Sequence, residues 1–219
     1  MTLLARGRDA AVFTHSPGRV LRRYARAADT AREVAVMDHA RDHGYPVPFA
    51  EALSDTDILL ERIDGPTMLD DLALRPWRVF AHARTLADLH RRLHAIEAPR
   101  WLPPFGDGDA LLHLDLHPRN VLLGPRGPSV IDWANARRGR GEADVAYAWM
   151  ILTTSEIDGV MGVRAVVLAT LRAVFAHAFL AGFDRAAIAR VVPMCARARL
   201  ADRNLRERER PRVRRLARV

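Results

Sequence analysis

The sequence predicts an α+β protein in which a small antiparallel sheet precedes a larger, mainly helical part. Short runs rich in branched and aromatic residues alternate with turn residues at the start of the chain, and helical patterns with a period near 3.6 dominate later. The chain has 219 residues and 49% apolar content, which is enough for one large domain or two small lobes that share a cleft.

The N-terminal sheet is predicted from short strands separated by turns. Its candidate strands are residues 2–7, 10–15, 19–24 and 57–63. The segment "SPGR" between the second and third strands reads as a turn with Pro and Gly at its centre. A helix is expected over residues 29–44, opened by a cap at Asp29 or Thr30 and closed by Gly44.

The later part of the chain is predicted to be mainly helical. Residues 76–96 place apolar side chains on one helical face, and residues 165–183 form the most apolar stretch. That stretch is long enough to cross a bilayer, but Arg172 and His177 within it favour a buried helix of a soluble protein, and we expect no membrane span.

Cysteine usage and charge limit the compartment and the partners. The single cysteine, Cys195, cannot form an internal disulfide, and the N-terminus lacks a secretory signal, so we expect a cytoplasmic protein. The net charge is +8, and residues 197–219 carry +7 of it through ten arginines and three acidic residues. Such a tail is ordinarily a solvated helix or a frayed end. If the protein binds nucleic acid or a membrane surface, we expect this tail to be the binding segment.

The apolar stretch "LLHLDLHPRNVLL" carries polar residues that a purely structural strand does not need. His113, Asp115 and His117 alternate, Asn120 follows five residues after Asp115, and Asp132 ends a second apolar strand, "SVIDW". Phosphoryl transfer from ATP requires such a set: a carboxylate that accepts the proton of the acceptor hydroxyl, and an amide oxygen and a second carboxylate that hold Mg²⁺.

At these residues the sequence resembles the aminoglycoside phosphotransferase and choline-kinase-like family, which shares its architecture with protein kinases. The family pattern H-G-D-x-H-x-x-N followed by [IV]-D-[WF] is matched by "HLDLHPRN" and "VIDW". The resemblance implies that Asp115 is the catalytic base and that Asn120 and Asp132 bind magnesium. It also implies that His113 supports the loop and that His117 falls where protein kinases have a lysine near the transferred phosphate.

The resemblance extends over most of the chain and implies a two-lobed protein-kinase-like fold. It places a nucleotide-binding lobe at residues 1–64, a catalytic and substrate lobe at 65–196 and the Arg-rich tail at 197–219. Within the second lobe, "GRGEADVAYAW" resembles G-D-P-x-x-D-[LV]-A, so Asp144 is expected to hold the catalytic loop through its backbone. The implied activity is ATP- and Mg²⁺-dependent phosphorylation of a hydroxyl on a small molecule, chosen by helices within residues 151–195.

The N-terminal lobe resembles the family in its third strand and the following helix. "RVLRRY" and "TAREVAVM" align Arg22 with the phosphate-binding lysine, which this lysine-free chain lacks, and Glu33 with its ion-pair partner. Glu33 also follows Thr30 as T-x-x-E, a capping box, so both interpretations of Glu33 stay open.

Two further segments of this lobe are expected to meet the nucleotide. Residues 5–13, with the single glycine Gly7, take the place of a phosphate-covering loop. "ERIDG" takes the place of the hinge, where backbone groups of Arg62, Ile63 and Asp64 would bind a purine edge.

Two other function classes stay open. A metal-dependent hydrolase could use the cluster His113, Asp115 and His117, but it would leave Asn120 and the "IDW" strand without a role. A non-catalytic kinase-like binding protein would bind ATP without turnover, or not at all. His90 and His94 share a helix face as zinc ligands can, but without the glutamate of H-E-x-x-H a structural role is favoured.

Overall fold

The computed structural model describes residues 1–7, 9–155, 162–202 and 205–218. Contacts within the chain divide it into two compact units. Unit 1 comprises Met1–Met68 and Arg119–Ala136, and unit 2 comprises Leu69–Pro118 and Arg137–Val219. The first segment of unit 1 ends at Met68, and residues 119–136 return to this unit.

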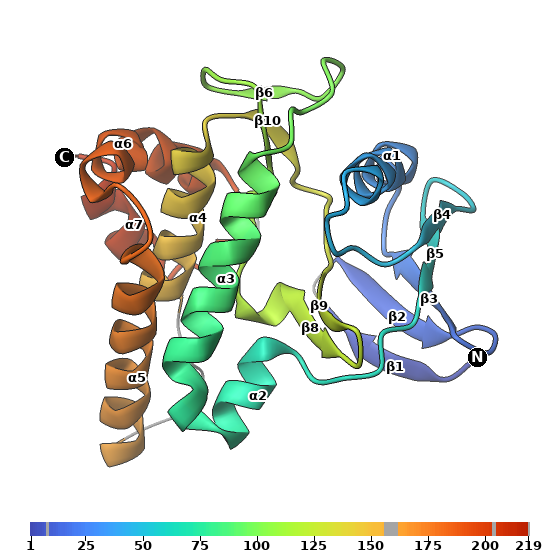
Figure 1. Ribbon diagram of the computed structural model, residues 1–219, viewed down its shortest axis with the longest axis horizontal. Helices are drawn as coiled ribbons and strands as arrows, with labels where there is room; N and C mark the ends of the chain where they lie inside the picture. The colour runs from blue at the N-terminus through green and yellow to red at the C-terminus, as the bar shows by residue number, and fades with distance from the viewer. Residues whose placement is uncertain (8, 156–161, 203–204, 219) are drawn as a thin grey trace. The chain divides into compact units, whose positions relative to one another are not determined.

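Unit 1 is built on a five-stranded antiparallel sheet with the order β1-β2-β3-β5-β4 (Figure 1). The strands are β1 (Leu3–Arg6), β2 (Ala10–Thr14), β3 (Arg19–Tyr24), β4 (Ala50–Ala52) and β5 (Asp57–Glu61). All four predicted strands are present, and β4 was not predicted because it is only three residues long. Gly18 adopts a φ of +71° in the β2–β3 turn, a conformation that favours glycine.

Helix α1 (Thr30–Asp42) belongs to unit 1 and buries Val36, Met37 and Ala40. Asp29 is the N-cap, because its side chain accepts a hydrogen bond from the Arg32 backbone N–H at 3.1 Å. Thr30 instead donates from its hydroxyl to the Ser54 carbonyl at 2.5 Å, so it does not form the cap of a capping box.

The hairpin β8 (Val121–Gly124) and β9 (Gly127–Val130) completes unit 1. It joins the first segment of the unit through the Leu123 N–H, which donates to the Pro66 carbonyl at 2.9 Å. Gly65 is needed beside this contact, because a Cβ there would overlap the Leu123 carbonyl oxygen. Through this contact the residues that follow the "HLDLHPRN" motif pack on the first segment of unit 1.

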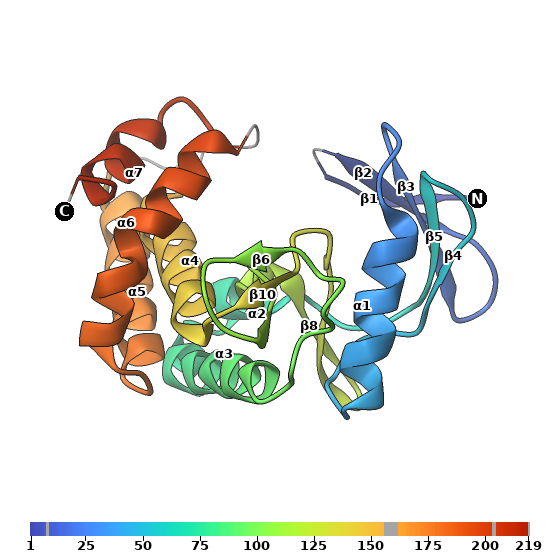
Figure 2. The same cartoon turned by 90° about the horizontal axis from the view of Figure 1, so that it is seen from above.

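Unit 2 is mainly helical (Figure 2). Its helices are α2 (Met68–Leu74), the short η1 (Pro76–Arg78), α3 (Val79–His94), α4 (Gly141–Thr154), α5 (Val163–Leu180), α6 (Arg185–Ala201) and α7 (Arg210–Leu216). A small sheet of order β6-β10-β7 joins β6 (Pro104–Phe105), β7 (Ala110–Leu112) and β10 (Arg137–Gly139). A turn η2 (Pro118–Asn120) leads from the motif into β8.

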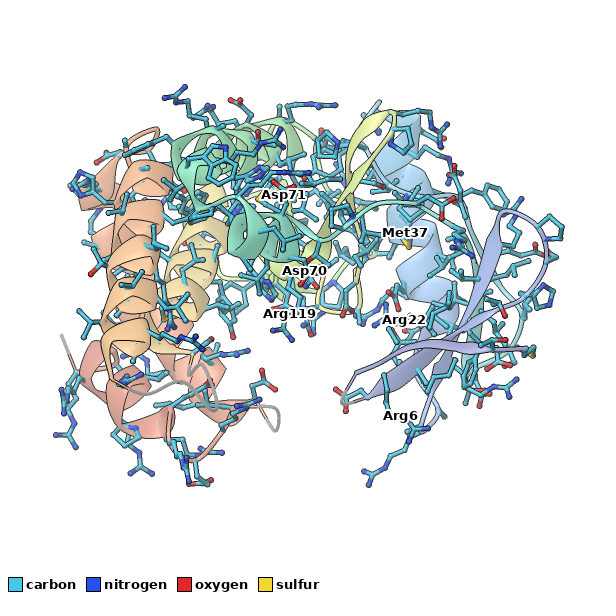
Figure 3. The ribbon with its side chains drawn as sticks, turned by 90° about the horizontal axis from the view of Figure 1, so that it is seen from below. Arg6, Arg22, Met37, Asp70, Asp71 and Arg119 are labelled. Atoms are coloured by element: carbon cyan, nitrogen blue, oxygen red, sulfur yellow. The ribbon has the colours of Figure 1, made fainter. Side chains whose placement is uncertain are left out.

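An ion-pair network links α2 to α3 in unit 2. Asp71 on α2 is almost fully buried and is directed toward α3 (Figure 3), where it contacts His82 Nε2 at 2.7 Å. Arg75 and Arg78 also donate to Asp71. Burial of a carboxylate is costly unless it is paired, and these three partners supply the compensation.

The C-terminal residues are folded rather than appended to unit 2. Helix α6 runs through the predicted boundary at residue 197, and α7 packs on α6 with Val213 fully buried and Leu205 nearly so. The predicted helix at 165–183 is α5, but only its second half is buried, since Val166 and Val167 are exposed while Phe175 and Phe179 are not. Within the described residues, no single helix has the length and apolarity to span a membrane, and the sharply bent pair formed by α5 and α6 meets that criterion by length and composition only.

Candidate active site

The "HLDLHPRN" loop is held in place by Asp144, in the first turn of α4. The Asp144 carboxylate is fully buried and accepts hydrogen bonds from the backbone N–H groups of His113, at 3.2 Å, and Leu114, at 2.7 Å. His94 Nε2 lies 3.0 Å from the same carboxylate. The prediction that Asp144 acts on the backbone of this loop is confirmed.

Asp144 fixes a loop whose backbone is strained. Leu114 has a φ of +58°, a region that a branched residue rarely occupies. Burial alone would raise the pKa of Asp144, but the hydrogen bond from His94 and the charges of nearby histidines lower it well below its ordinary value. The anion that anchors the loop is therefore charged at neutral pH. Its Oδ2 holds the His113 N–H and its Oδ1 holds the Leu114 N–H, in the conformation that precedes Asp115.

Asp115 follows this strained residue in unit 2 and pairs with His117. The distance from His117 Nε2 to Asp115 Oδ1 is 3.4 Å, and the two side chains are 17% and 21% exposed. Burial would raise the pKa of Asp115, but the hydrogen bond and charge of His117, with the charges of His113 and Arg199, lower it. Asp115 is thus an ionised, partly accessible carboxylate that can orient a hydroxyl and accept its proton.

In unit 1, Arg22 on β3 bridges two carboxylates. Its Nη1 donates to Glu33 Oε1 at 2.9 Å and its Nη2 to Asp132 Oδ1 at 2.6 Å, and Figure 3 shows Arg22 among the side chains of β3 and α1. Burial lowers the pKa of Arg22, but the negative charges of Asp132 and Glu33 outweigh this and raise it. Arg22 is therefore a permanent cation placed beside Asp132.

Glu33 is an ion-pair residue rather than a cap. Its carboxylate is buried and accepts hydrogen bonds from Arg22, from the Tyr24 hydroxyl at 2.5 Å and from the Trp133 backbone N–H at 3.2 Å. Of the two interpretations of Glu33, the contacts support ion pairing. The Trp133 contact also ties α1 directly to the residue after Asp132.

The hairpin of unit 1 brings Asn120 and Asp132 to one end. Val121 pairs with Val130, and the Ile131 N–H donates to the Asn120 carbonyl at 3.0 Å. Asn120 and Asp132 therefore lie next to the last paired residues at the same end of the hairpin. Asp132 has a φ of +69°, a second strained non-glycine position, and its side chain is 38% exposed. An amide oxygen and an accessible carboxylate at one end of a hairpin fit the oxygen-ligand preference of Mg²⁺.

The predicted hinge and phosphate-covering loop have specific contacts within unit 1. The Arg62 backbone N–H donates to the Gly18 carbonyl at 2.9 Å, and its Nε donates to Asp64 at 2.7 Å. The backbone N–H of Arg62 is therefore already engaged within unit 1, and purine binding by the backbone of Arg62, Ile63 and Asp64 stays a prediction. The Gly7 N–H donates to Ala10 at 2.8 Å, while Arg8 in the same predicted loop lies outside the described residues.

The metal-capable cluster of unit 2 is not the one that the hydrolase hypothesis requires. Among the described residues, the side chains whose ligand atoms converge are His90, His94 and Asp144, within 4.8 Å of one another. Both oxygens of Asp144 already accept hydrogen bonds, which accounts for its burial without a metal. The cluster His113, Asp115 and His117 does not form such a group.

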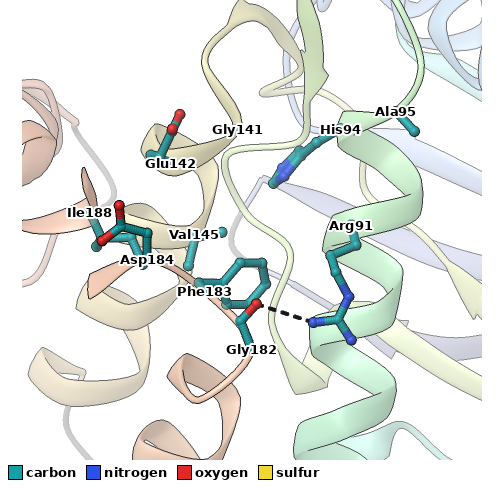
Figure 4. Close-up of a pocket in the computed structure, with 10 residues that line it drawn as sticks. All are labelled: Arg91, His94, Ala95, Gly141, Glu142, Val145, Gly182, Phe183, Asp184 and Ile188. Carbon is teal, nitrogen blue, oxygen red and sulfur yellow. Dashed lines mark hydrogen bonds between the residues drawn. The ribbon is translucent and has the colours of Figure 1, made fainter. Parts of the chain in front are cut away.

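An open pocket of about 510 Å³ lies beside this cluster in unit 2 (Figure 4). It lies where the end of α3, the start of α4 and the α5–α6 turn meet. His94 and Arg91 line one side and Phe183 the other, and Arg91 Nη1 donates to the Gly182 carbonyl at 3.4 Å. The pocket borders His94, not Asp115, so it is not the site of the proposed chemistry.

Sequence reasoning missed two contacts, those of Tyr24 and the Trp133 backbone with Glu33, and it missed the charge of Arg199 that acts on Asp115. Tyr24 could have been identified, because it lies two residues beyond Arg22 on the same face of β3. Arg199 carries no local signal, since arginine is common throughout the C-terminal residues.

A five-stranded antiparallel sheet with one helix, followed by a helical unit whose "HLDLHPRN" loop is anchored by an aspartate, has the protein-kinase-like fold. The chain belongs to the phosphotransferase enzyme family (APH), whose model matches residues 1–112 and 100–189. This confirms both the family resemblance and the predicted fold class.

Solved structures agree on the fold at low sequence identity. A thermostable mutant of aminoglycoside phosphotransferase APH(4)-Ia, in a ternary complex with AMP-PNP and hygromycin B, is 16% identical with a TM-score of 0.72, and the match covers 99% of this chain and 92% of that one. A choline/ethanolamine kinase family protein from Mesorhizobium loti is 16% identical with a TM-score of 0.61, covering 100% and 89%. ADP-bound APH(2'')-Ib is 14% identical with a TM-score of 0.60, covering 99% and 91%. No curated protein matches the chain by sequence.

Proposed function

We propose that this phosphotransferase transfers the γ-phosphoryl group of ATP, with Mg²⁺, to a hydroxyl group of a small molecule. The observation that carries the proposal is the Arg22 bridge in unit 1, which joins Glu33 to Asp132 at 2.9 and 2.6 Å. A partly buried guanidinium beside a carboxylate that is partly open to solvent is suited to phosphate oxygens on one side and a metal ion on the other.

Magnesium would be held by the two oxygen donors at the end of the hairpin. Asp132 offers an accessible carboxylate, and Asn120, at the end of η2 just before β8, offers an amide oxygen. The bound ion would neutralise the phosphate charge as it develops, which is its ordinary contribution to phosphoryl transfer. Solved structures with AMP-PNP or ADP share this fold and support a nucleotide in this chain.

The chain's own chemistry would be proton transfer and orientation. Asp115 accepts the proton of the acceptor hydroxyl as that oxygen bonds to the γ-phosphorus and the bond to the ADP oxygen breaks, so the proton ends on Asp115 and ADP leaves. The lowered pKa keeps Asp115 deprotonated at neutral pH and so available to receive the proton, and the Asp144 anchor keeps its loop in position. The hydrogen bond from His117 limits the rotation of the Asp115 carboxylate.

The test separates the two aspartates by comparing transfer with nucleotide binding. We expect Mg-ATP to stabilise the wild-type protein by about 2.7 kcal/mol at a hundred times Kd, and EDTA to remove most of this. Asp115→Asn should lower transfer by about 10²- to 10⁴-fold while sparing Mg-ATP binding by calorimetry. Asp132→Asn should weaken both.

The matched control for these variants is Asp88→Asn, which changes an exposed aspartate on α3. It should leave binding and transfer unchanged. Equal loss of Mg-ATP binding in Asp115→Asn and Asp132→Asn would overturn the division of roles. ATP binding without transfer to any acceptor would instead favour the non-catalytic alternative.

A further inference from the structure

Helix α6 of unit 2 brings an arginine toward the base loop. The helix packs along α4, where the Cys195 thiol lies 3.6 Å from the Ala143 carbonyl oxygen. One helical turn further along each helix are Arg199 and Tyr147, which periodicity places on the same two faces. Tyr147 is buried and packs edge-to-face on Phe105, with ring centroids 5.8 Å apart.

The packing of α6 along α4 places Arg199 on the α6 face toward α4, and its charge acts on both Tyr147 and Asp115. Burial raises the pKa of Tyr147 to about 12, and the charge of Arg199 acts against that rise. The same charge contributes, after His117 and His113, to the lowered pKa of Asp115. The Arg199 guanidinium therefore influences both the buried Tyr147 and the proposed base Asp115.

Arg199 has unused hydrogen-bonding capacity. Its Nη1 donates to Asp202 at 2.7 Å, and Asp202 is its one partner in the described part of the chain. Its side chain is 16% exposed, and its Nε and Nη2 are not among the atoms buried without a partner, so this edge still reaches solvent. Nε and Nη2 form the edge of a guanidinium that binds an oxyanion in a bidentate manner.

The negative groups near Arg199 are already committed. Asp202 is paired with Arg199, and Asp115 is the proposed base. The two carboxylates among the main influences on the pKa of Tyr147 are these same residues, Asp202 and Asp115. An ammonium group on the acceptor would therefore find no free carboxylate here, whereas an oxyanion would find two free N–H donors.

We propose that the acceptor is a small hydroxyl compound that also carries an oxyanion, a carboxylate or a phosphate, and that Arg199 binds this group and determines specificity. The inference rests on the proposed kinase function. Binding of the oxyanion by Arg199 would hold the acceptor with its hydroxyl at Asp115, which makes Arg199 a specificity residue rather than a catalytic one. Long-range attraction by the Arg-rich C-terminal residues would act in the same direction.

The experiment uses the full chain with Mg-ATP and acceptors in matched pairs. The pairs are glycerate and glycerol, gluconate and glucose, and ribose 5-phosphate and ribose; ethanolamine serves as a cationic acceptor. The glycerate and gluconate pairs test for a carboxylate on the acceptor, and the ribose 5-phosphate pair tests for a phosphate. We expect transfer to at least one anionic member with a kcat/KM about ten- to a hundred-fold above its neutral partner, the value of one charge-assisted contact.

Variants of Arg199 assign the effect to this residue. Arg199→Gln should remove the preference mainly by raising the KM of the anionic acceptor, while the kcat/KM of the neutral partner stays within about twofold. Arg199→Lys should restore part of it. The matched control is Arg197→Gln, which removes the same charge from an exposed position two residues earlier on α6.

The outcomes separate this inference from the proposed function. Intact Mg-ATP binding with no transfer to any anionic acceptor, or equal preference in wild type and Arg199→Gln, would overturn the assignment of Arg199. Efficient transfer to ethanolamine in preference to the anionic compounds would overturn the substrate class. Loss of Mg-ATP binding in the wild-type protein would instead overturn the kinase function itself.

Discussion

His90 should make the protein sensitive to mild acid. The side chain lies on α3 with no exposed surface, and neither ring nitrogen has a hydrogen-bond partner in the described part of the chain. Its ring stacks on the His94 ring, with the centroids 5.6 Å apart, and contacts the Phe179 ring, with the centroids 5.1 Å apart. Burial lowers the pKa of His90 to about 3, and the negative charge of Asp144 opposes this only in part.

The sign of the effect follows from proton linkage. In the unfolded chain a histidine has a pKa of about 6.5. Between pH 6.5 and about pH 3, the unfolded state therefore binds a proton at His90 that the native state does not bind. Stability is therefore unaffected by His90 above about pH 7 and falls as the pH drops, by about 1.4 kcal/mol per unit. At pH 5 the loss is about 2 kcal/mol.

The variant His90→Leu removes this proton-binding difference and keeps an apolar side chain among the phenylalanines. We expect the drop in the free energy of unfolding between pH 7.5 and pH 5 to shrink by about 2 kcal/mol relative to wild type. At pH 7.5 the variant should be as stable or more stable, because two unpaired buried nitrogens are removed. Urea unfolding at four pH values in this range measures both quantities.

The control is His177→Leu, which removes an exposed histidine from α5. The groups that act on His90 are Asp144, His94, His113 and Arg91, and all are retained in the variant. An unchanged pH dependence in His90→Leu would refute the reasoning, because it would mean that His90 is protonated in the native state or hydrated there.

Two other predictions concern the site and its acceptor. Glu33→Gln should destabilise the protein by about 1 to 3 kcal/mol and weaken Mg-ATP binding, because Glu33 accepts hydrogen bonds from Arg22, Tyr24 and Trp133; a calorimetric Kd equal to wild type would contradict this. Kanamycin, neomycin and streptomycin should be poor acceptors, because polycations need surplus carboxylates, whereas residues 133–196 contain five acidic residues against seven arginines and Asp144 is committed to the loop. Efficient phosphorylation at micromolar concentrations in a coupled assay would overturn this second prediction.

The amino-acid sequence by itself determined the features that depend on local pattern. The strands β1, β2, β3 and β5 follow from short branched runs between turn residues, and α3 follows from a 3.6-residue apolar period. Spacing within the motifs "HLDLHPRN" and "VIDW" predicted one base and two metal ligands, and these roles stay predictions. The backbone role of Asp144 was predicted by resemblance and is confirmed by its contacts with the loop.

The tertiary structure alone decided the features that depend on long-range contacts. Arg22 meets Asp132 across 110 positions of sequence, Glu33 meets Trp133 across 100, and residues 119–136 return to unit 1. Arg199 is one of many C-terminal arginines, and only the packing of α6 along α4 distinguishes it from Arg197. The physical reason is that hydrophobic period and turn chemistry act over a few residues, whereas the partner of a buried charge is set by which segments pack together, and no local pattern encodes that choice.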